Sequence, residues 1–420
     1  MRIFYSFLIA ISTPAVLLYF ALRGVRDSAY FSGWGERFGF VRYPGKTGGI
    51  LLHAASVGEF NAAKPLINAL LKTYPELPLT VTTLTPTGAE RVRNELGNRV
   101  FHAYIPLDLP SVVSRFMKSV QPRLIIVMET EIWPNFYLRA QRQKIPLMMA
   151  NARLSEISVS RYQRLSGLIR SVLRTVAWVG AQSEQDAKRL ISCGAVPEST
   201  EITGNLKFEV DIPASLWEKG TALRAQWPAL RRVLIAGSTH EADENVIIPA
   251  FTELLENLPD ALLILVPRHP ERFGHVAQAA NAAGLRVQLL SQGAICSGEI
   301  QCFVVDAMGE LIKYYACADI AFVGGSIGHQ GGHNPLEPAA LGKPVIVGPN
   351  MANASEITTK LLESGAAMQI RNRQEFRDAA EKLLVDGNKR DRMGQAGLSL
   401  IEKNKGALEL TLAAIRRQLN

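Results

Sequence analysis

Short segments that are apolar from end to end recur along this chain, with helix-forming sequence between them. Strands of this kind belong to parallel sheets covered by helices on both faces, because neither face of such a strand meets water. In the first half the predicted strands are residues 49–54, 79–84, 100–105, 124–128, 147–150 and 176–180. In the second half they are residues 233–236, 262–266, 286–290, 302–305, 320–323, 345–347 and 367–369. The pattern predicts an α/β fold with two doubly wound, parallel-sheet domains.

Helices are predicted between these strands, among them residues 62–72, 88–96, 376–384 and 398–419. The alternation of strand and helix is interrupted between residues 208 and 228, where a Val-Asp-Ile-Pro segment stands. We therefore expect an N-terminal domain over 24–212 and a C-terminal domain over 213–420, with the last helix able to pack back on the N-terminal domain. Two such domains are expected to face a cleft at the carboxyl ends of their strands, where these folds place ligands.

The N-terminus is predicted to be a membrane anchor over residues 1–23. Residues 3–22 carry no charge and stand between Arg2 and Arg23, and about 20 residues of helix cross the hydrocarbon core. Pro14 would kink this helix without excluding it, and no small-x-small cleavage site of a signal peptide follows. Basic residues predominate over acidic ones in the segment 23–46, so the positive-inside rule places the body of the protein in the cytoplasm.

The net charge indicates which partners suit the protein, and the cysteine spacing indicates its redox compartment. The formal net charge of +8 suits an anionic membrane surface or phosphorylated substrates. No run of basic residues interleaved with aromatic ones is present, which disfavours nucleic acid as a partner. The four cysteines show no Cys-x-x-Cys spacing and are expected to be free thiols in a reducing compartment; they are Cys193, Cys296, Cys302 and Cys317.

The densest polar sequence is a Gly/His-rich segment between two predicted strands of the second half, residues 324–337. Its glycines are expected to let backbone N–H groups approach a ligand, because no Cβ stands in the way. A helix is predicted to open near Pro335, with its positive end toward the loop and Glu337 in its first turn, where it can accept hydrogen bonds from a ribose. An α/β domain holds an anionic sugar nucleotide in this way; the alternative is a mobile surface loop.

In the first half, the segment from His53 to Glu59 follows the first predicted strand. Glu59 stands three residues after Ser56, which is the spacing of a capping box. The alternative is a general base, since a carboxylate at a strand–helix corner can remove a proton from an acceptor hydroxyl. We expect that one carboxylate cannot cap a helix and deprotonate an alcohol at the same time.

Glu129 and Glu131 follow another strand and should point to opposite sides while the chain stays extended. A metal site on this pair is disfavoured, because the chain contains no Asp-x-Asp to hold a divalent ion against a diphosphate. Arg153 and Lys207 follow later strands and are candidate anion contacts. For each of them the alternative is an ordinary solvated surface position.

The second half adds three polar motifs after strands, at residues 237–241, 267–272 and 306–310. The planar guanidinium group of Arg268 can donate two parallel hydrogen bonds to a phosphate, and His269 adds a hydrogen-bond donor beside it. The backbone of Met308 and its neighbours is a candidate for bonding a base edge, while Glu310 alternatively sits in the first turn of the next helix. Together with the Gly/His-rich segment, these motifs predict a nucleotide site.

In this order, the motifs resemble the 3-deoxy-D-manno-octulosonic acid (Kdo) transferase family of lipopolysaccharide biosynthesis. The resemblance spans essentially the whole chain and also includes residues 34–39, 129–135, 151–154, 204–207 and 331–338. It implies the GT-B glycosyltransferase fold, with two Rossmann-like domains facing a cleft. It further implies inverting, metal-independent transfer of Kdo from CMP-Kdo to the lipid A precursor lipid IV(A), at the cytoplasmic face of the inner membrane beside anionic lipids.

The resemblance also assigns residues. Glu59 resembles the catalytic base, and no cofactor is expected. The residues resembling the CMP-binding set are Arg268, His269, Met308, Gly309, Glu310, Asn334, Pro335, Leu336 and Glu337. The candidates for supporting the acceptor or the transition state are Glu129, Glu131, Arg153 and Lys207. Two alternatives stay open: a sugar-nucleotide epimerase of the same fold, and a non-catalytic, membrane-tethered binder of nucleotides or glycolipids.

Overall fold

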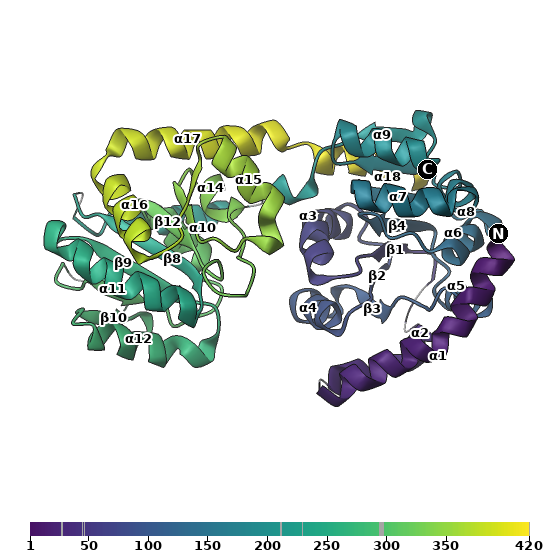
Figure 1. Cartoon of the computed structure of the whole chain (residues 1–420), viewed down its shortest axis with the longest axis horizontal. Coiled ribbons are helices and arrows are strands. Elements are labelled where there is room, and N and C mark those ends of the chain that lie inside the picture. Colours follow the sequence, from purple (N-terminus) through teal and green to yellow (C-terminus); the bar gives the residue numbers. More distant parts are fainter. Residues whose placement is uncertain are drawn as a thin grey trace. The chain divides into compact units, whose positions relative to one another are not determined.

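The structure, a computed structural model, describes residues 1–26, 28–43, 45, 47–210, 212–228, 230–293 and 298–419 (Figure 1). It divides the chain into two compact units. The first unit is Met1–Glu209 together with Asn404–Asn420, and the second is Val210–Lys403. The predicted boundary after residue 212 lies three residues beyond this division. Cys193, Cys302 and Cys317 are buried free thiols, as expected, and Cys296 lies outside the described residues.

The first unit is built on a parallel sheet with the strand order β3-β2-β1-β4-β5-β6-β7. Its strands are β1 (Ile50–His53), β2 (Leu79–Thr83), β3 (Phe101–Tyr104), β4 (Leu124–Met128), β5 (Leu147–Ala152), β6 (Trp178–Ala181) and β7 (Thr200–Ile202). The sequence did not predict β7. This strand contains Thr200 and Glu201, is partly exposed and pairs only with β6, so it lacks the apolar run of the interior strands.

Helices cover both faces of this sheet. Alternate residues of β4 belong to different cores: Ile125 and Val127 pack with α5, α6, α8 and α9, whereas Ile126 and Met128 pack with α3, α4 and α18. This two-sided burial is the reason for the uniformly apolar strand sequences. The helices of the unit are α1 (Arg2–Arg26), α2 (Trp34–Arg37), α3 (Val57–Thr73), α4 (Pro86–Leu96), α5 (Pro110–Val120), α6 (Pro134–Arg142), α7 (Glu156–Arg164), α8 (Ser166–Leu173), α9 (Glu184–Cys193) and α18 (Ala407–Leu419).

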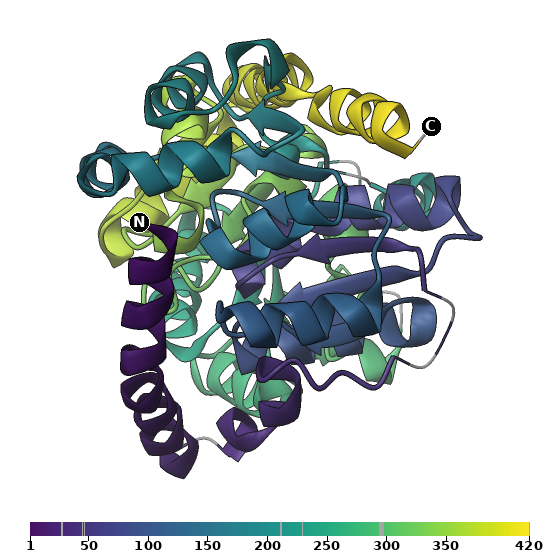
Figure 2. The same cartoon turned by 90° about the vertical axis from the view of Figure 1, so that its right-hand side faces the viewer.

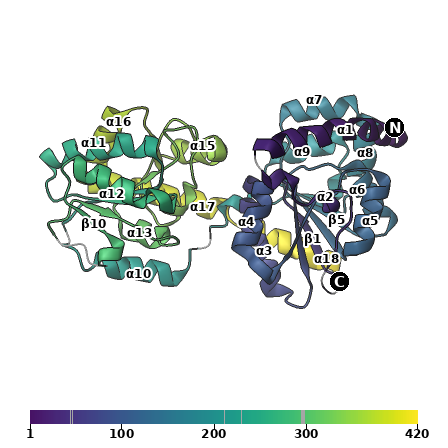
Figure 3. The same ribbon diagram turned by 90° about the horizontal axis from the view of Figure 1, so that it is seen from below.

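The second unit repeats the architecture, with the parallel order β10-β11-β9-β8-β12-β13-β14. Helices α10 and α13 cover one face of the sheet, and α11 and α16 the other (Figure 3). The strands are β8 (Val233–Thr239), β9 (Leu262–Pro267), β10 (Val287–Leu289), β11 (Cys302–Val304), β12 (Ile320–Val323), β13 (Val345–Val347) and β14 (Ala367–Gln369). The helices are α10 (Ala214–Arg224), α11 (Glu241–Asn257), α12 (Phe273–Ala282), α13 (Leu311–Cys317), α14 (Leu336–Ala340), α15 (Ser355–Glu363), α16 (Arg373–Val385) and α17 (Gly387–Asn404).

The prediction of one helix over 398–419 is wrong. Two helices, α17 and α18, meet there, and the chain turns at Gly406, whose φ of +106° ends helical geometry. The carboxylate of Glu209 accepts hydrogen bonds from the N–H groups of Gly406 (2.8 Å) and Leu408 (3.2 Å) and so caps α18. Helix α18 packs against α3 of the first unit.

In each sheet the chain crosses from one side of the first strand to the other, between β1 and β4 in the first unit and between β8 and β12 in the second. Chains leaving neighbouring strands at such a point turn to opposite faces, which leaves room for a ligand at the carboxyl ends. The segments that follow β1 and β4 carry Glu59 and Glu129. Those that follow β8 and β12 carry His240 and the Gly/His-rich loop, so each unit places its main predicted motifs at its switch point.

Candidate functional site

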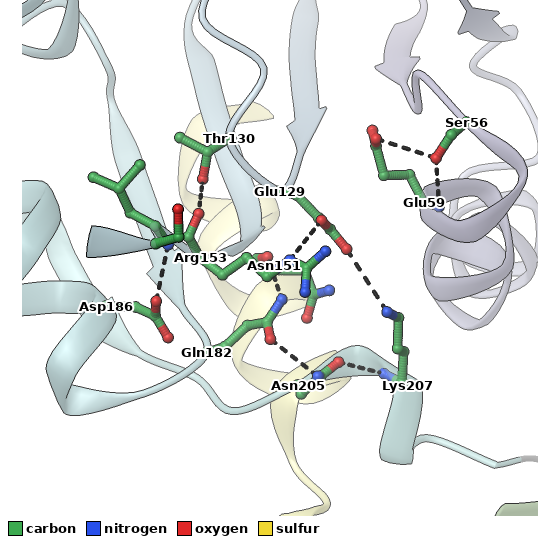
Figure 4. A network of polar contacts seen from close by, with 12 residues as sticks. Ser56, Glu59, Glu129, Thr130, Asn151, Arg153, Gln182, Asp186, Asn205 and Lys207 are labelled. Atoms are coloured by element: carbon green, nitrogen blue, oxygen red, sulfur yellow. Dashed lines mark hydrogen bonds and ion pairs between the residues drawn. The ribbon is translucent and has the colours of Figure 1, made fainter. Parts of the chain in front are cut away.

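Glu59 lies in the first turn of α3, close to the carboxyl end of β1 (Figure 4). Ser56 is the N-cap, and its hydroxyl oxygen accepts a hydrogen bond from the Glu59 N–H (3.3 Å). The Glu59 carboxylate accepts from the Ala55 N–H (2.8 Å) and from the Ser56 hydroxyl (3.3 Å). The capping spacing therefore predicted the geometry, with the carboxylate reaching the N–H of Ala55 rather than that of Ser56.

This capping does not exclude a role as base. A carboxylate has about four lone-pair positions, and the Glu59 carboxylate uses two of them in the contacts just described. The expectation that one carboxylate cannot both cap and deprotonate is therefore too strict. Both roles are chemically compatible because they use different lone pairs.

The surroundings of Glu59 place its titration near neutrality. Burial raises its pKa to about 7, and the nearby carboxylates of Glu131 and Glu129 act in the same direction. The hydrogen bonds from Ala55 and Ser56 lower the pKa and oppose this effect. The side chain is nearly enclosed, with the residue 9% exposed. A carboxyl group poised near pH 7 is suited to general-base chemistry.

Glu129 follows β4 and adopts a left-handed backbone conformation, with φ of +54°. Its carboxylate forms ion pairs with two cations (Figure 4). One oxygen lies 2.8 Å from Arg153 Nε, and the other lies 3.8 Å from Lys207 Nζ. The two predicted anion contacts thus meet at one carboxylate. A left-handed conformation is unfavourable for a residue other than glycine, and such strain is often found at functional sites.

Glu131 completes a group of three neighbouring carboxylates. Burial raises its pKa, and the charge of Glu129 adds to the effect. The backbone carbonyl of Glu131 accepts a hydrogen bond from the Tyr137 hydroxyl (2.8 Å). Among the residues that the structure describes, no group of three or more His, Cys, Asp or Glu side chains is arranged to hold a metal ion.

An amide network supports Lys207, and the sequence reasoning missed its central member, Gln182. The Gln182 side chain donates to the Asn151 carbonyl (2.8 Å) and accepts from the Asn205 side chain (3.0 Å). Asn205 in turn accepts from the Lys207 N–H (2.9 Å), and Asn151 accepts from the Leu206 N–H (2.9 Å). The Asn151 Nδ2 group is buried and has no hydrogen-bond partner among the described residues. It is therefore an unused donor within this network.

In the second unit, Asp243 organises the site, and the sequence reasoning missed it as well. It is fully buried in the first turn of α11. Its carboxylate accepts from the N–H groups of His240 (2.9 Å), Gly325 (2.7 Å) and Ile327 (3.1 Å). Asp243 therefore fixes the Gly/His-rich loop to the start of α11. Its position three residues after the helix N-cap was the signal available in the sequence.

Three histidines gather beside this loop. His240 and His333 approach with their Nε2 atoms 3.0 Å apart and their rings stacked, and the ring of His269 meets that of His240 edge-on at 5.3 Å. Burial lowers the pKa of His240, which favours the neutral ring. The backbone N–H of Arg268 bonds to the Thr239 carbonyl (3.0 Å). The structure thus brings the predicted residues Arg268 and His269 next to the loop.

The other predicted nucleotide contacts surround the same sheet edge. Asn334 donates to the Glu337 carboxylate (3.2 Å) and accepts from the Leu336 N–H (3.1 Å) across Pro335, the N-cap of the short helix α14. Met308 and Gly309 follow β11, and Met308 is 58% exposed. Glu310 stands at the start of α13 and forms an ion pair with Lys313. Residues 308–310 follow β11 and residues 334–337 follow β12. Only β9 and β8 lie between these two strands in the sheet.

Contacts within the unit also constrain the glycines of the loop. A Cβ on Gly324 would lie 2.3 Å from the Ser238 carbonyl oxygen, one on Gly331 would lie 2.8 Å from Asn353 Nδ2, and one on Gly332 would lie 2.3 Å from Met351 Sδ. Close packing against backbone therefore requires glycine at Gly324, whereas at Gly331 and Gly332 the positive φ (+86° and +75°) is a further constraint. Gly309 differs, because a Cβ there would meet nothing within 4 Å and its positive φ (+85°) is the constraint.

Comparison with known proteins identifies similar chains. A family model described as "3-Deoxy-D-manno-octulosonic-acid transferase (kdotransferase)" matches residues 32–210, and one described as "Glycosyl transferases group 1" matches residues 288–399. The 3-deoxy-D-manno-octulosonic acid transferase of Haemophilus influenzae is 39% identical over 421 residues, covering 100% of this chain and 99% of the relative. That of Bordetella pertussis is 34% identical, covering 87% of this chain and 86% of the relative.

Among solved structures, the UDP-GlcNAc 2-epimerase of Neisseria meningitidis, bound to UDP-GlcNAc, aligns with a TM-score of 0.53. The alignment covers 88% of this chain and 99% of the epimerase, with 15% sequence identity. At this identity the likeness concerns the fold, which in both proteins consists of two Rossmann-like domains of the GT-B kind.

Proposed function

The chain belongs to the 3-deoxy-D-manno-octulosonic acid (Kdo) transferase family and is a glycosyltransferase, and we propose that it moves Kdo from CMP-Kdo to the lipid A precursor lipid IV(A). The proposed reaction inverts the anomeric centre, needs no metal ion and takes place at the cytoplasmic face of the inner membrane. The observation that carries the mechanism is the buried Glu59 carboxyl group with a pKa of about 7.

In the proposed mechanism, Glu59 accepts the proton of an acceptor hydroxyl as that oxygen attacks the anomeric carbon of Kdo. The bond between this carbon and the phosphate oxygen breaks, and its electron pair leaves with CMP. A single displacement of this kind inverts the anomeric centre. A base that titrates near pH 7 is ionised in a substantial fraction of molecules at neutral pH and still has the affinity to hold the proton.

The donor is proposed to bind at the carboxyl ends of β8, β9, β11 and β12. The Arg268 guanidinium suits the phosphate of CMP, since its planar fork matches phosphate oxygens. Asn334 and Glu337 suit the ribose hydroxyls, and the backbone of Met308 and Gly309 suits the base edge. Charge on the departing phosphate would be stabilised by Arg268 and by the loop that Asp243 fixes.

Acceptor binding is proposed for the polar cluster of the first unit. Arg153 and Lys207 carry positive charge next to Glu129, and lipid IV(A) carries phosphates that such groups can attract. The buried, unpartnered Nδ2 of Asn151 supplies a donor for an acceptor oxygen. Leaving that donor unsatisfied costs about 1–3 kcal/mol, which a ligand oxygen would recover.

The test is a transfer assay with CMP-Kdo and lipid IV(A), with and without a chelator, on the natural chain and on Glu59→Gln. We expect metal-independent transfer, loss of at least 100-fold in kcat for Glu59→Gln, and unchanged CMP binding. Glu184→Gln is a matched control, because Glu184 also lies in the first turn of a helix but is exposed.

Two results would contradict the mechanism: transfer that depends on added Mg²⁺, or a Glu59→Gln variant with normal kcat. The anomeric configuration of the product, read by NMR, tests inversion separately. The epimerase alternative predicts a changed sugar without any acceptor. The binder alternative predicts no turnover at all, so a parallel incubation with a UDP-sugar separates it from an epimerase.

A further inference from the structure

Helix α1 is the one helix of the described residues that is long and apolar enough to cross a membrane, over Arg2–Val25. One of its faces is nevertheless partly covered over the full length of the helix. The covered positions recur at helical spacing; they are Arg2, Tyr5, Ser6, Ile9, Thr13, Val16, Leu17, Phe20, Ala21 and Gly24. Figure 2 shows α1 running beside the helices of the first unit.

The first turns of α1 are hydrogen-bonded to buried groups of the first unit. The Tyr5 hydroxyl donates to the Asp108 carboxylate (2.9 Å), and Arg2 Nε donates to the Asn135 side chain (3.0 Å). Ser6 also bonds to Asn135. Asp108 is 2% exposed and accepts from the N–H groups of Asn135 (2.9 Å) and Phe136 (2.8 Å) at the start of α6. The N-terminal end of α1 is therefore part of the polar framework of the unit.

The last turns of α1 contact the same unit. The ring of Phe20 lies 4.8 Å from the guanidinium carbon of Arg37, which is 4% exposed and donates to the Leu84 carbonyl (2.9 Å). The same guanidinium lies over the ring of Tyr104 at the end of β3 (4.1 Å). Both ends of α1 are thus held by the unit that carries Glu59.

The opposite face of α1 is apolar and uncovered. Of the 21 large apolar side chains that stand strongly exposed in the described chain, 12 lie in residues 1–40. On α1 they include Ile3, Phe4, Phe7, Leu8, Ile11, Leu18, Leu22 and Val25. An apolar surface of this size is unfavourable in water and indicates a partner.

A helix that crosses a bilayer has its ends on opposite sides of a hydrocarbon layer about 30 Å thick. Both ends cannot then contact one water-soluble unit. We propose that α1 does not span the membrane but lies flat in one leaflet, with its apolar face among the acyl chains and its covered face against the first unit. The protein is then a monotopic membrane protein, with its N-terminus and its catalytic body on the same side.

Cationic and aromatic groups at the end of α1 fit this arrangement. The Arg23 guanidinium lies 5.4 Å from the rings of Tyr19 and Tyr30, and that of Arg115 lies 4.0 Å from the ring of Phe40, which is 62% exposed. Such pairs are typical of the headgroup level, where rings meet the acyl boundary and guanidinium groups meet lipid phosphates. The partner is therefore an anionic lipid surface.

Depth measurements on the full chain in vesicles of phosphatidylglycerol and phosphatidylethanolamine test the proposal. Nitroxide labels are placed singly at Phe4→Cys, Ile11→Cys and Leu18→Cys, in an active background whose four native cysteines are replaced. These positions lie seven residues apart, which is about 10 Å along a helix axis. A flat helix places all three labels at one shallow depth, about 5–10 Å below the headgroups, whereas a spanning helix separates Phe4 from Leu18 by about 20 Å.

Leu230→Cys, at a position of the second unit that is 91% exposed, is the water-accessible control. A second measurement treats vesicles that display the catalytic body outward with an impermeant protease, using a cleavable tag before Met1. The proposal expects cleavage of the tag and is overturned by its protection. It is also overturned by a depth gradient along the three labels, or by labels that stay in water while the chain forms dimers through α1.

Discussion

Replacing Glu59 by glutamine should destroy activity and at the same time stabilise the fold at alkaline pH. The folded protein holds this carboxyl group at a pKa of about 7, against 4.5 for an unperturbed glutamate. Because each pKa unit corresponds to about 1.4 kcal/mol, ionised Glu59 costs the fold about 3 kcal/mol. Glutamine carries no charge, and its carbonyl oxygen can still accept the Ala55 N–H hydrogen bond.

The sign of the pH dependence follows from the raised pKa. The stability contributed by protonated Glu59 is fully present below pH 4.5 and is lost as pH rises through 7. Glu59→Gln should therefore equal the natural chain near pH 4.5 and exceed it by up to about 3 kcal/mol at pH 8.5. For a unit of this size, that difference corresponds to roughly 6–12 °C in Tm.

Urea denaturation of both chains at several pH values from 4.5 to 8.5 measures this difference. In parallel, kcat/KM of the natural chain should rise with pH and level off above about 7, as the base ionises. Glu184→Gln, at an exposed position, should show neither effect. A Glu59→Gln variant that is less stable than the natural chain at pH 8.5 would refute the assignment of Glu59 as a buried base that the fold disfavours in its charged form.

Three further predictions concern the neighbours of Glu59 and the donor site. Asp243→Asn should lower the free energy of unfolding of the second unit by about 2–4 kcal/mol, since three N–H groups lose a charged acceptor, as measured by urea denaturation; an unchanged midpoint would contradict this. Arg268→Lys should weaken CMP binding about tenfold by calorimetry, because an ammonium cannot reproduce the fork, and unchanged affinity would remove Arg268 from the phosphate site. Glu129→Asn should abolish most activity while leaving the free energy of unfolding unchanged or higher by about 1 kcal/mol, because asparagine tolerates φ > 0; a loss of several kcal/mol would show that the ion pairs with Arg153 and Lys207 outweigh the strain.

The sequence predicted the fold well because one physical cause, burial on both faces, leaves a simple record. A strand such as Leu124–Met128 has no polar position at all, and both of its faces are packed. Where that cause is weaker the prediction failed. The edge strand β7 keeps polar residues because one side of it meets no neighbouring strand, and the break before α18 depends on the single residue Gly406.

The sequence predicted candidate site residues but not the contacts that hold them together. Residues that follow strands could be found from the pattern, which predicted Glu59, Glu129 and Arg268 as candidates. The contacts that hold the site together join residues far apart in the chain, such as Asp243 with Gly325, and no local pattern encodes them. The backbone strain at Glu129 is likewise invisible in the sequence, because nothing in a Met-Glu-Thr-Glu run predicts a positive φ.

The hydrogen bonds that Glu59 accepts at the start of α3 explain how a carboxyl group can be buried and still be partly ionised near neutral pH. A carboxylate in the first turn of a helix normally has a lowered pKa, because the N–H groups and the helix dipole favour its charge. Here burial and the charges of Glu131 and Glu129 outweigh that effect. Without the cap, the same burial would raise the pKa further and leave too little base at neutral pH. In the proposed mechanism, the hydrogen bonds from Ala55 and Ser56 therefore serve the base as well as the helix: they fix the carboxylate in place and oppose the rise of its pKa.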